Sequence, residues 1–154
     1  MNKFNPQPGP RLSAETLHCS TVTSDGRAVL ITGPSGSGKS DLTLRLLDRG
    51  FKLVSDDQTV IKKDGERVMA SAPPTIAGKL EVRGIGIVEM DRVENVPVAL
   101  IVELTSSDIQ RLPDDSRERP LLGVRVPLVS VDAMTASAPS KVALALDRMG
   151  LKFK

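Results

Sequence analysis

The chain has 154 residues and a net charge of +2, with 21 basic and 19 acidic side chains spread along its length. That length suits one domain with one hydrophobic core, and the small charge argues against a nucleic-acid or membrane partner. The aromatic residues are three phenylalanines only, which leaves few rings for single-stranded nucleic acid to stack on. The single cysteine excludes an intrachain disulfide, and no segment is apolar for the roughly 20 residues that span a bilayer. We therefore expect a cytoplasmic protein.

The N-terminal part of the chain is predicted to contain a disordered tail and a β-hairpin. Residues 1–11 hold three prolines and are expected to be disordered, whereas 12–154 should form a single domain, because no repeat or linker divides it. A β-prone run over 17–23, a turn signal at Asp25-Gly26 and an apolar run over 28–32 predict a hairpin whose second strand is buried.

A glycine-rich loop, Gly33-Pro34-Ser35-Gly36-Ser37-Gly38-Lys39-Ser40, follows this strand and precedes a helix predicted over 41–49. Glycines let successive backbone N–H groups curl around phosphate oxygens, and the following helix adds its positive N-terminal end. Lys39 is expected to reach the β and γ phosphates, and the Ser40 hydroxyl to ligate Mg²⁺. The loop therefore predicts a site for a nucleoside triphosphate with magnesium.

Two carboxylates end the next predicted strand, over 51–55, which completes a βαβ unit after Gly50 closes the helix. Because the helix is short, Asp56 and Asp57 should return beside the phosphates. One carboxylate could hold the metal through water, and the other could accept a proton from an attacking hydroxyl. The competing interpretation is a polar end of a strand, with both residues capping a turn.

The second half of the chain is predicted to be mostly β-structure. Gly84 and Gly86 make 78–90 a loop running into a strand rather than one long strand. Glu81 and Arg83 would share one face of a strand and could form an exposed ion pair, but the nearby glycines favour a functional loop. The other predicted elements are strands over 59–62 and 67–70 joined at Asp64-Gly65, a strand over 98–104, a polar loop or short helix over 106–120, a strand over 124–131 and a helix over 137–149.

Four blocks of the sequence resemble the C-terminal catalytic domain of the HPr kinase/phosphorylase family. They are Leu17-His18, the P-loop with Asp41 after it, Leu53-Val54-Ser55-Asp56-Asp57, and Leu80-Glu81-Val82-Arg83-Gly84-Ile85-Gly86-Ile87. The resemblance implies an α/β P-loop fold related to phosphoenolpyruvate carboxykinase, with a mixed sheet, a helix after the P-loop and a C-terminal helix. It also implies an ATP- and Mg²⁺-dependent serine kinase that acts on HPr, the phosphocarrier protein of the bacterial phosphotransferase system. Phosphorolysis of phosphoserine-HPr by inorganic phosphate and assembly as a homo-hexamer are implied as well.

The resemblance further implies roles for single residues. His18 is the only histidine, and without the family match it would be interpreted as a surface or capped strand residue. By position, the resemblance makes Asp57 the base that takes the serine proton, with Asp56 supporting it. It makes Lys39 the phosphate clamp, and Ser40 and Glu81 the magnesium ligands. It makes His18 a neighbour that orients or stabilises the transferring phosphate, and Arg83 a positive charge that neutralises that phosphate.

Two features depart from the family pattern. Long members carry an N-terminal domain, whereas the first matching block here begins at Leu17, so we expect a form with the catalytic domain alone. The family's arginine- and glycine-containing loop, associated with the reverse reaction, corresponds here to Val124-Arg125-Val126-Pro127-Leu128-Val129-Ser130. Arg125 is the candidate for that role, and we predict the kinase direction ahead of phosphorolysis.

Other functions that a P-loop could serve stay open at this point. The loop also resembles that of guanylate kinases, although no lid or base-reading segment accompanies it. A transporter-type ATPase is disfavoured, because the Leu-Ser-Gly-Gly signature is missing. A regulatory module is the alternative without chemistry, with ATP ordering a loop such as 106–120 and changing partner binding.

Overall fold

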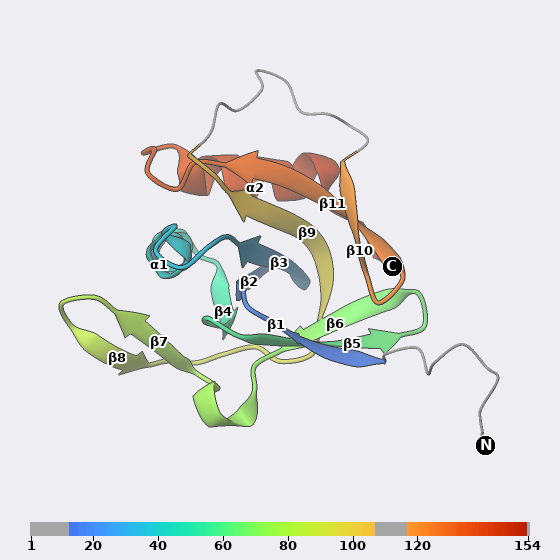
Figure 1. Ribbon diagram of the computed structural model, residues 1–154, viewed down its shortest axis with the longest axis horizontal. Helices are drawn as coiled ribbons and strands as arrows, with labels where there is room; N and C mark the ends of the chain where they lie inside the picture. Colours follow the sequence, from blue (N-terminus) through green and yellow to red (C-terminus); the bar gives the residue numbers. More distant parts are fainter. Residues whose placement is uncertain (1–12, 107–116, 154) are drawn as a thin grey trace.

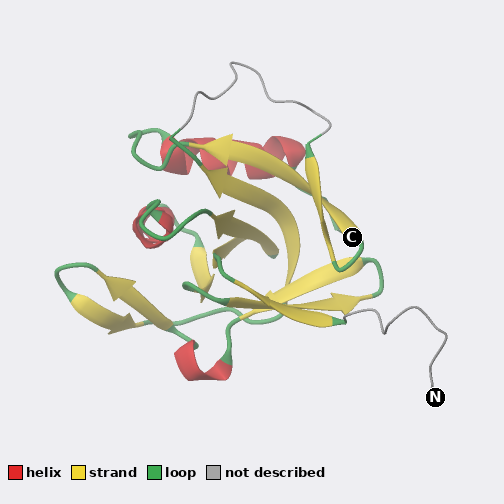
Figure 2. Ribbon diagram, viewed as in Figure 1, coloured by secondary structure: helices red, strands yellow, loops and turns green. Residues whose placement is uncertain are grey.

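The computed structural model describes residues 13–106 and 117–153. These residues form one mixed nine-stranded sheet, a separate two-stranded hairpin, two α-helices and one 3-10 turn (Figures 1 and 2). In chain order the elements are β1 (Ala14–Leu17), β2 (Ser20–Ser24), β3 (Arg27–Thr32), α1 (Lys39–Asp48), β4 (Lys52–Ser55), β5 (Thr59–Asp64), β6 (Arg67–Ser71), η1 (Pro74–Ile76), β7 (Lys79–Val82), β8 (Gly86–Glu89), β9 (Val96–Leu104), β10 (Glu118–Leu121), β11 (Val124–Val131) and α2 (Ala138–Met149).

The direction of the central strands decides where the loops after them lie. Strands β3 and β11 both pair with β9 in parallel, and β2 pairs antiparallel with both β3 and β4. The predicted strand–helix–strand unit is present, and β3 and β4 point the same way, but β2 lies between them, so the two strands do not pair with each other. Their carboxyl ends still share one edge of the sheet. The P-loop after β3 and the carboxylates after β4 consequently emerge together.

Both faces of the central sheet are covered. On β3, Val29 and Ile31 belong to one apolar cluster with α1 and α2, whereas Ala28 and Leu30 belong to a second cluster with β4, β5, β6 and β10. A strand buried on both sides has no polar face, which explains the continuous apolar run in the sequence. The expected single core is thus two clusters separated by the central strands.

Strand β9 is the longest strand and connects the two halves of the sheet. Its first residues pair with β6 and its last residues with β11, and it bends strongly between them (Figure 1). The bend folds β1, β5 and β6 over one face, while α2 lies along β9 and β11 on the other. Neither helix of the described residues is long and apolar enough to cross a membrane.

Local turn and helix predictions are confirmed where short-range chemistry controls them. Asp25 and Gly26 have φ of 55° and 72°, as a two-residue hairpin turn requires, and both predicted helices are present. Gly50, with φ of 106°, directly follows the C-cap of α1 in the left-handed conformation expected there. The predicted mixed α/β sheet, with a helix after the P-loop and a C-terminal helix, is therefore confirmed.

Three predictions are corrected by tertiary pairing. The β5–β6 turn falls at Gly65 and Glu66, one residue later than predicted. Residues 78–90 form the β7–β8 hairpin rather than a loop running into a strand, because Gly84 serves the turn and leaves two pairing arms. The predicted loop 106–120 overlaps strand β10, which begins at Glu118 and ends at Leu121. Residues 107–116 lie outside the described residues, as does the predicted disordered tail 1–11.

Candidate phosphate and carboxylate site

The P-loop backbone requires glycine at defined positions. Gly36 and Gly38 have φ of 81° and 101°, in the left-handed region that other residues rarely adopt. A Cβ on Gly33 would lie 2.6 Å from the Oγ of Ser37 and 3.2 Å from the Cβ of Leu104, so a larger residue there would displace Ser37. Gly38 is also the N-cap of α1, which places the positive end of the helix at the loop. A glycine-rich loop that ends at a helix N-terminus is suited to binding an anion.

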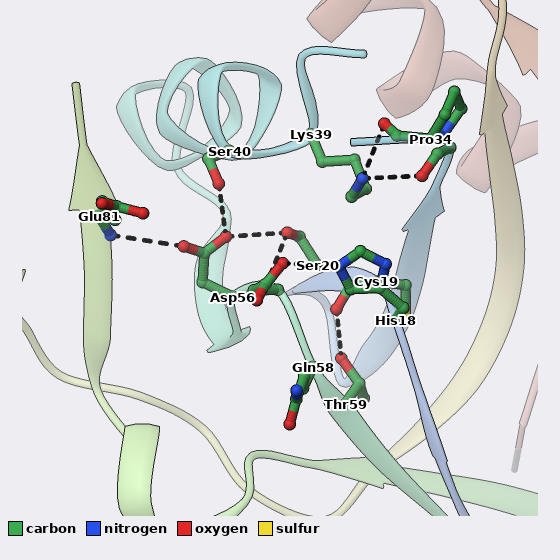
Figure 3. Close-up of polar contacts among 12 residues, drawn as sticks. His18, Cys19, Ser20, Pro34, Lys39, Ser40, Asp56, Gln58, Thr59 and Glu81 are labelled. Atoms are coloured by element: carbon green, nitrogen blue, oxygen red, sulfur yellow. Dashed lines mark hydrogen bonds and ion pairs between the residues drawn. The ribbon is translucent and has the colours of Figure 1, made fainter. Parts of the chain in front are cut away.

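Lys39 is the first residue of α1 and is buried. Its Nζ donates to the carbonyl oxygens of Gly33, at 2.7 Å, and Pro34, at 3.0 Å (Figure 3). These two bonds hold the ammonium group inside the loop, and the third N–H remains for another acceptor. A phosphate oxygen cradled by the loop would be such an acceptor.

Ser37 adds a second sign that the loop is built for a ligand. Its Oγ is buried and has no hydrogen-bond partner in the described part of the chain. An unsatisfied buried hydroxyl costs about 1–3 kcal/mol, so such groups are rare unless a ligand pairs with them. The loop therefore fits a phosphate group on an observation that is independent of the sequence motif.

Asp56 is the centre of the polar contacts beside the loop. Its Oδ1 accepts hydrogen bonds from the hydroxyls of Ser40 and Ser20, both at 2.9 Å, and its Oδ2 accepts from the N–H of Glu81 at 3.4 Å (Figure 3). The side chain is almost fully buried, at 6% exposure. A buried carboxylate needs such donors. The arrangement joins β2, α1, β4 and β7 at one carboxyl group.

Asp57 lies next to this centre but is exposed to solvent. Its Oδ1 is 2.9 Å from the Nε2 of His18, and both side chains are more than half exposed. Asp57 has φ of 71°, a left-handed conformation that aspartate tolerates better than most residues. Asp56 thus faces inward to the P-loop serine, whereas Asp57 presents a free carboxylate edge and a histidine to an incoming molecule.

Ser20 is a site residue that sequence analysis missed. It is fully buried at the start of β2, donates to Asp56 and accepts the backbone N–H of Asp57 at 3.2 Å. One hydroxyl therefore orients both carboxylate-bearing residues. Nothing local in the sequence marks it, because the contacts span 36 and 37 residues. The only hint is its position two residues after His18.

The other predicted site residues, Glu81, Arg83 and Arg125, differ in how they lie relative to Asp56. Glu81 contacts it through its backbone N–H, and its side chain is exposed on β7. Arg83 lies in the β7–β8 turn, and no ion pair joins it to Glu81 among the described residues. Arg125 lies near the start of β11, at the opposite edge from the P-loop, and pairs with Glu118 at 3.7 Å. Arg125 therefore lies away from the P-loop of its own chain.

Part of the predicted loop 106–120 is anchored to the sheet. Arg117 and Arg119 each place a guanidinium nitrogen 3.2 Å from one carboxylate oxygen of Glu103. Glu103 pairs with Thr32, the last residue of β3 before the P-loop. The described end of this segment is therefore held beside the phosphate edge by two ion pairs.

The donor set suits magnesium only together with phosphate. No group of three or more His, Cys, Asp or Glu side chains that could hold a metal ion occurs in residues 13–106 and 117–153. Magnesium in phosphate sites commonly takes one or two protein oxygens, substrate phosphates and waters. Ser40 and Asp56 at the P-loop, with Glu81 beside them, fit that pattern.

Comparison with known proteins identifies the family. The family model described as HPr Serine kinase C-terminal domain matches residues 11–145. The chain belongs to the HPr serine kinase family. The HPr kinase/phosphorylase of Chlorobium phaeobacteroides is 36% identical over 129 residues, covering 76% of this chain and 38% of that protein. The enzyme of the same name from Clostridium botulinum is 35% identical over 133 residues, covering 79% and 44%.

The fold of an HPr serine kinase is also found by structural comparison. A solved structure of the Hpr(Ser) kinase/phosphatase from Coxiella burnetii matches with a TM-score of 0.76 and 29% identity, covering 86% of this chain and 88% of that one. The predicted P-loop fold related to phosphoenolpyruvate carboxykinase is thereby confirmed. The chain spans less than half the length of the curated relatives that it matches.

Proposed function

We propose that this chain is an ATP- and Mg²⁺-dependent serine kinase that phosphorylates HPr. The observation that carries the proposal is the arrangement at Asp56 and Asp57. One carboxylate is bonded to the P-loop serine, and the next in sequence is exposed and paired with His18. Adjacent carboxylates with these two environments match the needs of phosphoryl transfer to a hydroxyl. The family name of the relatives supports HPr as the acceptor.

The transfer step assigns one task to each residue. Asp57 accepts the proton of the acceptor serine as its oxygen bonds to the γ-phosphorus and the bond to the ADP oxygen breaks. His18, at 2.9 Å from Asp57, orients that carboxylate and lies where it can stabilise the transferring group. Lys39 and Arg83 neutralise the negative charge of the phosphoryl oxygens.

The metal would be held by oxygen ligands beside the loop. Ser40 supplies a hydroxyl, Glu81 a carboxylate, and Asp56 a carboxylate that keeps the Ser40 hydroxyl in place. When bound, Mg²⁺ supplies positive charge to the β and γ phosphate oxygens. The orphaned Oγ of Ser37 and the donors of Gly33–Ser40 would complete the phosphate contacts.

The same residues would serve phosphorolysis. Inorganic phosphate would attack the phosphoserine, which yields pyrophosphate, and Asp57 would return the proton to the serine oxygen. Arg125 does not support this direction, because it lies at the far edge of the sheet. The reverse reaction therefore rests on the family relationship.

The domain organisation and assembly are part of the proposal. We propose that residues 12–154 act as one catalytic domain, since both apolar clusters draw on strands from across the described chain. A homo-oligomer, a hexamer by family resemblance, stays a prediction that light scattering would measure.

The decisive experiment is intact-mass spectrometry of HPr incubated with the protein, ATP and Mg²⁺, beside the Asp57→Asn variant. We expect one added phosphate with the wild type and a rate at least about 100-fold lower with the variant, because the base is lost. Nucleotide affinity should change little. Asparagine tolerates the left-handed backbone at position 57, so the fold should persist.

A matched control separates the role of the carboxylate from that of the turn. Asp25→Asn makes the same change at another aspartate of positive φ, 55°, in the β2–β3 turn, and should leave transfer unchanged. If the wild type and both variants bound ATP but left HPr unmodified, the result would favour the regulatory module instead. Equal rates of HPr phosphorylation by the wild type and Asp57→Asn would support the kinase proposal but show that Asp57 is not its base.

A further inference from the structure

The β11–α2 loop, residues 132–137, lies at the same edge of the sheet as the P-loop. Strand β11 runs parallel to β9, and β9 runs parallel to β3, so the carboxyl ends of all three strands share that edge. The strands there follow the order β11, β9, β3, β2, β4 (Figure 1). The P-loop after β3 therefore has Asp56 and Asp57 on one flank, after β4, and the β11–α2 loop on the other.

Specific contacts hold the β11–α2 loop against the start of α1. A Cβ added to Gly38, the last glycine of the P-loop, would lie 3.1 Å from the Cβ of Ala133. Arg45 donates to the carbonyl oxygens of Ala133 and Thr135, and its Nε lies 3.1 Å from a carboxylate oxygen of Asp41. Asp41 belongs to the first turn of α1. The loop is therefore fixed beside the helical turn whose unpaired N–H groups suit it to phosphate.

Met134 is the side chain that this loop presents to solvent. It is 78% exposed, whereas its neighbour Ala133 is buried. Its N–H donates to Oδ1 of Asp132 at 2.9 Å, and the hydroxyl of Thr135 donates to the backbone carbonyl oxygen of Asp132 at 2.8 Å. The backbone on both sides of Met134 is thus held in place, and packing within the described residues does not account for a large apolar side chain there.

In-line transfer determines on which side of the γ-phosphate the nucleoside lies. The attacking and leaving oxygens stand on opposite sides of the γ-phosphorus. In the proposed reaction the serine hydroxyl approaches at the exposed Asp57, so the ADP group lies on the side away from Asp57. The β11–α2 loop occupies that flank of the P-loop. ADP would therefore extend past the first turn of α1 toward Met134.

We infer that the β11–α2 loop is the seat of the nucleoside part of ATP, with Met134 packing on the face of the purine ring. This inference rests on the proposed function and deepens it, because it assigns the part of the nucleotide that the P-loop does not hold. A methionine sulfur packs favourably against aromatic rings. The phenylalanines of the described residues lie elsewhere, because Phe51 is buried in the core and Phe153 packs under Arg67.

The test compares ATP with inorganic tripolyphosphate, which is a chain of phosphates without a nucleoside. Met134→Ser should raise the Kd for ATP with Mg²⁺ by about 5- to 10-fold in calorimetry, and leave the Kd for tripolyphosphate with Mg²⁺ at the wild-type value. Met134→Leu keeps an apolar side chain of similar size and should retain the ATP affinity within about 2-fold. Leu144→Ser removes another exposed aliphatic side chain, 57% exposed on α2, and should change neither Kd.

Each outcome either supports or overturns the nucleoside seat. An unchanged Kd for ATP in Met134→Ser would overturn it while leaving the kinase intact. An equal loss for ATP and tripolyphosphate would also overturn it, because the loop would then act on the P-loop and not on the nucleoside. A loss confined to ATP, in a protein that transfers no phosphate to HPr, would support the seat and refute the kinase. A wild type that bound neither ligand would refute the phosphate site, and both proposals with it.

Discussion

Ser20 and Asp56 define the site at the scale of single residues. The P-loop motif can be recognised in isolation, but its serine is oriented by a carboxylate from β4, which is itself held by a hydroxyl from β2. Ser20 also accepts the N–H of Asp57. The geometry of both carboxylates therefore depends on one buried hydroxyl.

Replacing Ser20 with alanine should lower catalysis more than binding. The change leaves the N–H of Asp57 without this acceptor and removes one donor from Asp56, so we expect a loss of about 1–3 kcal/mol in unfolding free energy. Misplacement of the carboxylates should lower kcat for HPr phosphorylation by about 10- to 100-fold, with a smaller change in KM for ATP.

The control for Ser20 is Thr23→Ala on the same strand. Thr23 is also buried and donates to the carbonyl of Arg27 at 2.8 Å, away from the P-loop. Its loss should lower stability without changing kcat. A Ser20→Ala enzyme with wild-type kcat would show that Ser20 is only structural.

At the scale of elements, the P-loop and α1 are built as a single unit. Gly38 ends the loop and caps the helix, and α1 in turn holds the loop after β11. Arg45 donates to the carbonyl oxygens of Ala133 and Thr135, and the Cβ of Ala133 lies against Gly38. A change at Gly38 is therefore transmitted to the phosphate donors.

Gly38→Ala tests this coupling. The backbone there has φ of 101°, and the added Cβ would lie 3.1 Å from the Cβ of Ala133. We expect a loss of at least about 1–2 kcal/mol in stability by urea unfolding, and an ATP affinity at least about 10-fold lower by calorimetry.

Gly26→Ala provides the comparison for Gly38→Ala. Gly26 has φ of 72° in the β2–β3 turn, and its added Cβ would meet no atom within 4 Å. Backbone strain in Gly26→Ala should lower the unfolding free energy by an amount similar to that in Gly38→Ala, whereas the ATP affinity of Gly26→Ala should equal that of the wild type. If both variants bound ATP equally well, the left-handed backbone at Gly38 would not matter to the phosphate site.

At the scale of the whole molecule, the curled sheet places Cys19 in the second apolar cluster. Burial raises the pKa of its thiol above the ordinary value of 9.0, because the thiolate would lose hydration. Hydrogen bonds with Thr59 and Thr21 and the charge of Lys39 oppose this only in part. The folded protein therefore keeps a proton that the unfolded chain releases in alkaline solution.

The stability of the protein should consequently fall as the pH rises above 9.0. Below pH 9.0 the Cys19 thiol holds its proton in both the folded and the unfolded state. Above that pH the thiol of the unfolded chain loses its proton first, which lowers the free energy of unfolding by up to about 1.4 kcal/mol per pH unit. Urea unfolding at about pH 8 and about pH 10 should show a steeper loss for the wild type than for Cys19→Ala. Parallel losses in the two proteins would contradict a buried neutral thiol.

Local structure was largely predictable from the sequence. The turn at Asp25 and Gly26, the P-loop with its following helix, and the C-terminal helix all depend on contacts between residues a few positions apart. The hairpin over 78–90 was missed, because glycines within an expected strand favour a loop unless the turn itself uses them.

The sequence by itself determined the phosphate loop, the two helices, most strand positions and the pair of carboxylates, since backbone sterics and the periodicity of apolar residues act over short distances. Only the tertiary structure decided that β2 lies between β3 and β4, that Ser20 holds Asp56 and Asp57, and that Ile87 stands opposite Glu81. These contacts join strands that are separated along the chain or depend on pairing register. Register is set by the packing of both sheet faces, which no short stretch of sequence encodes.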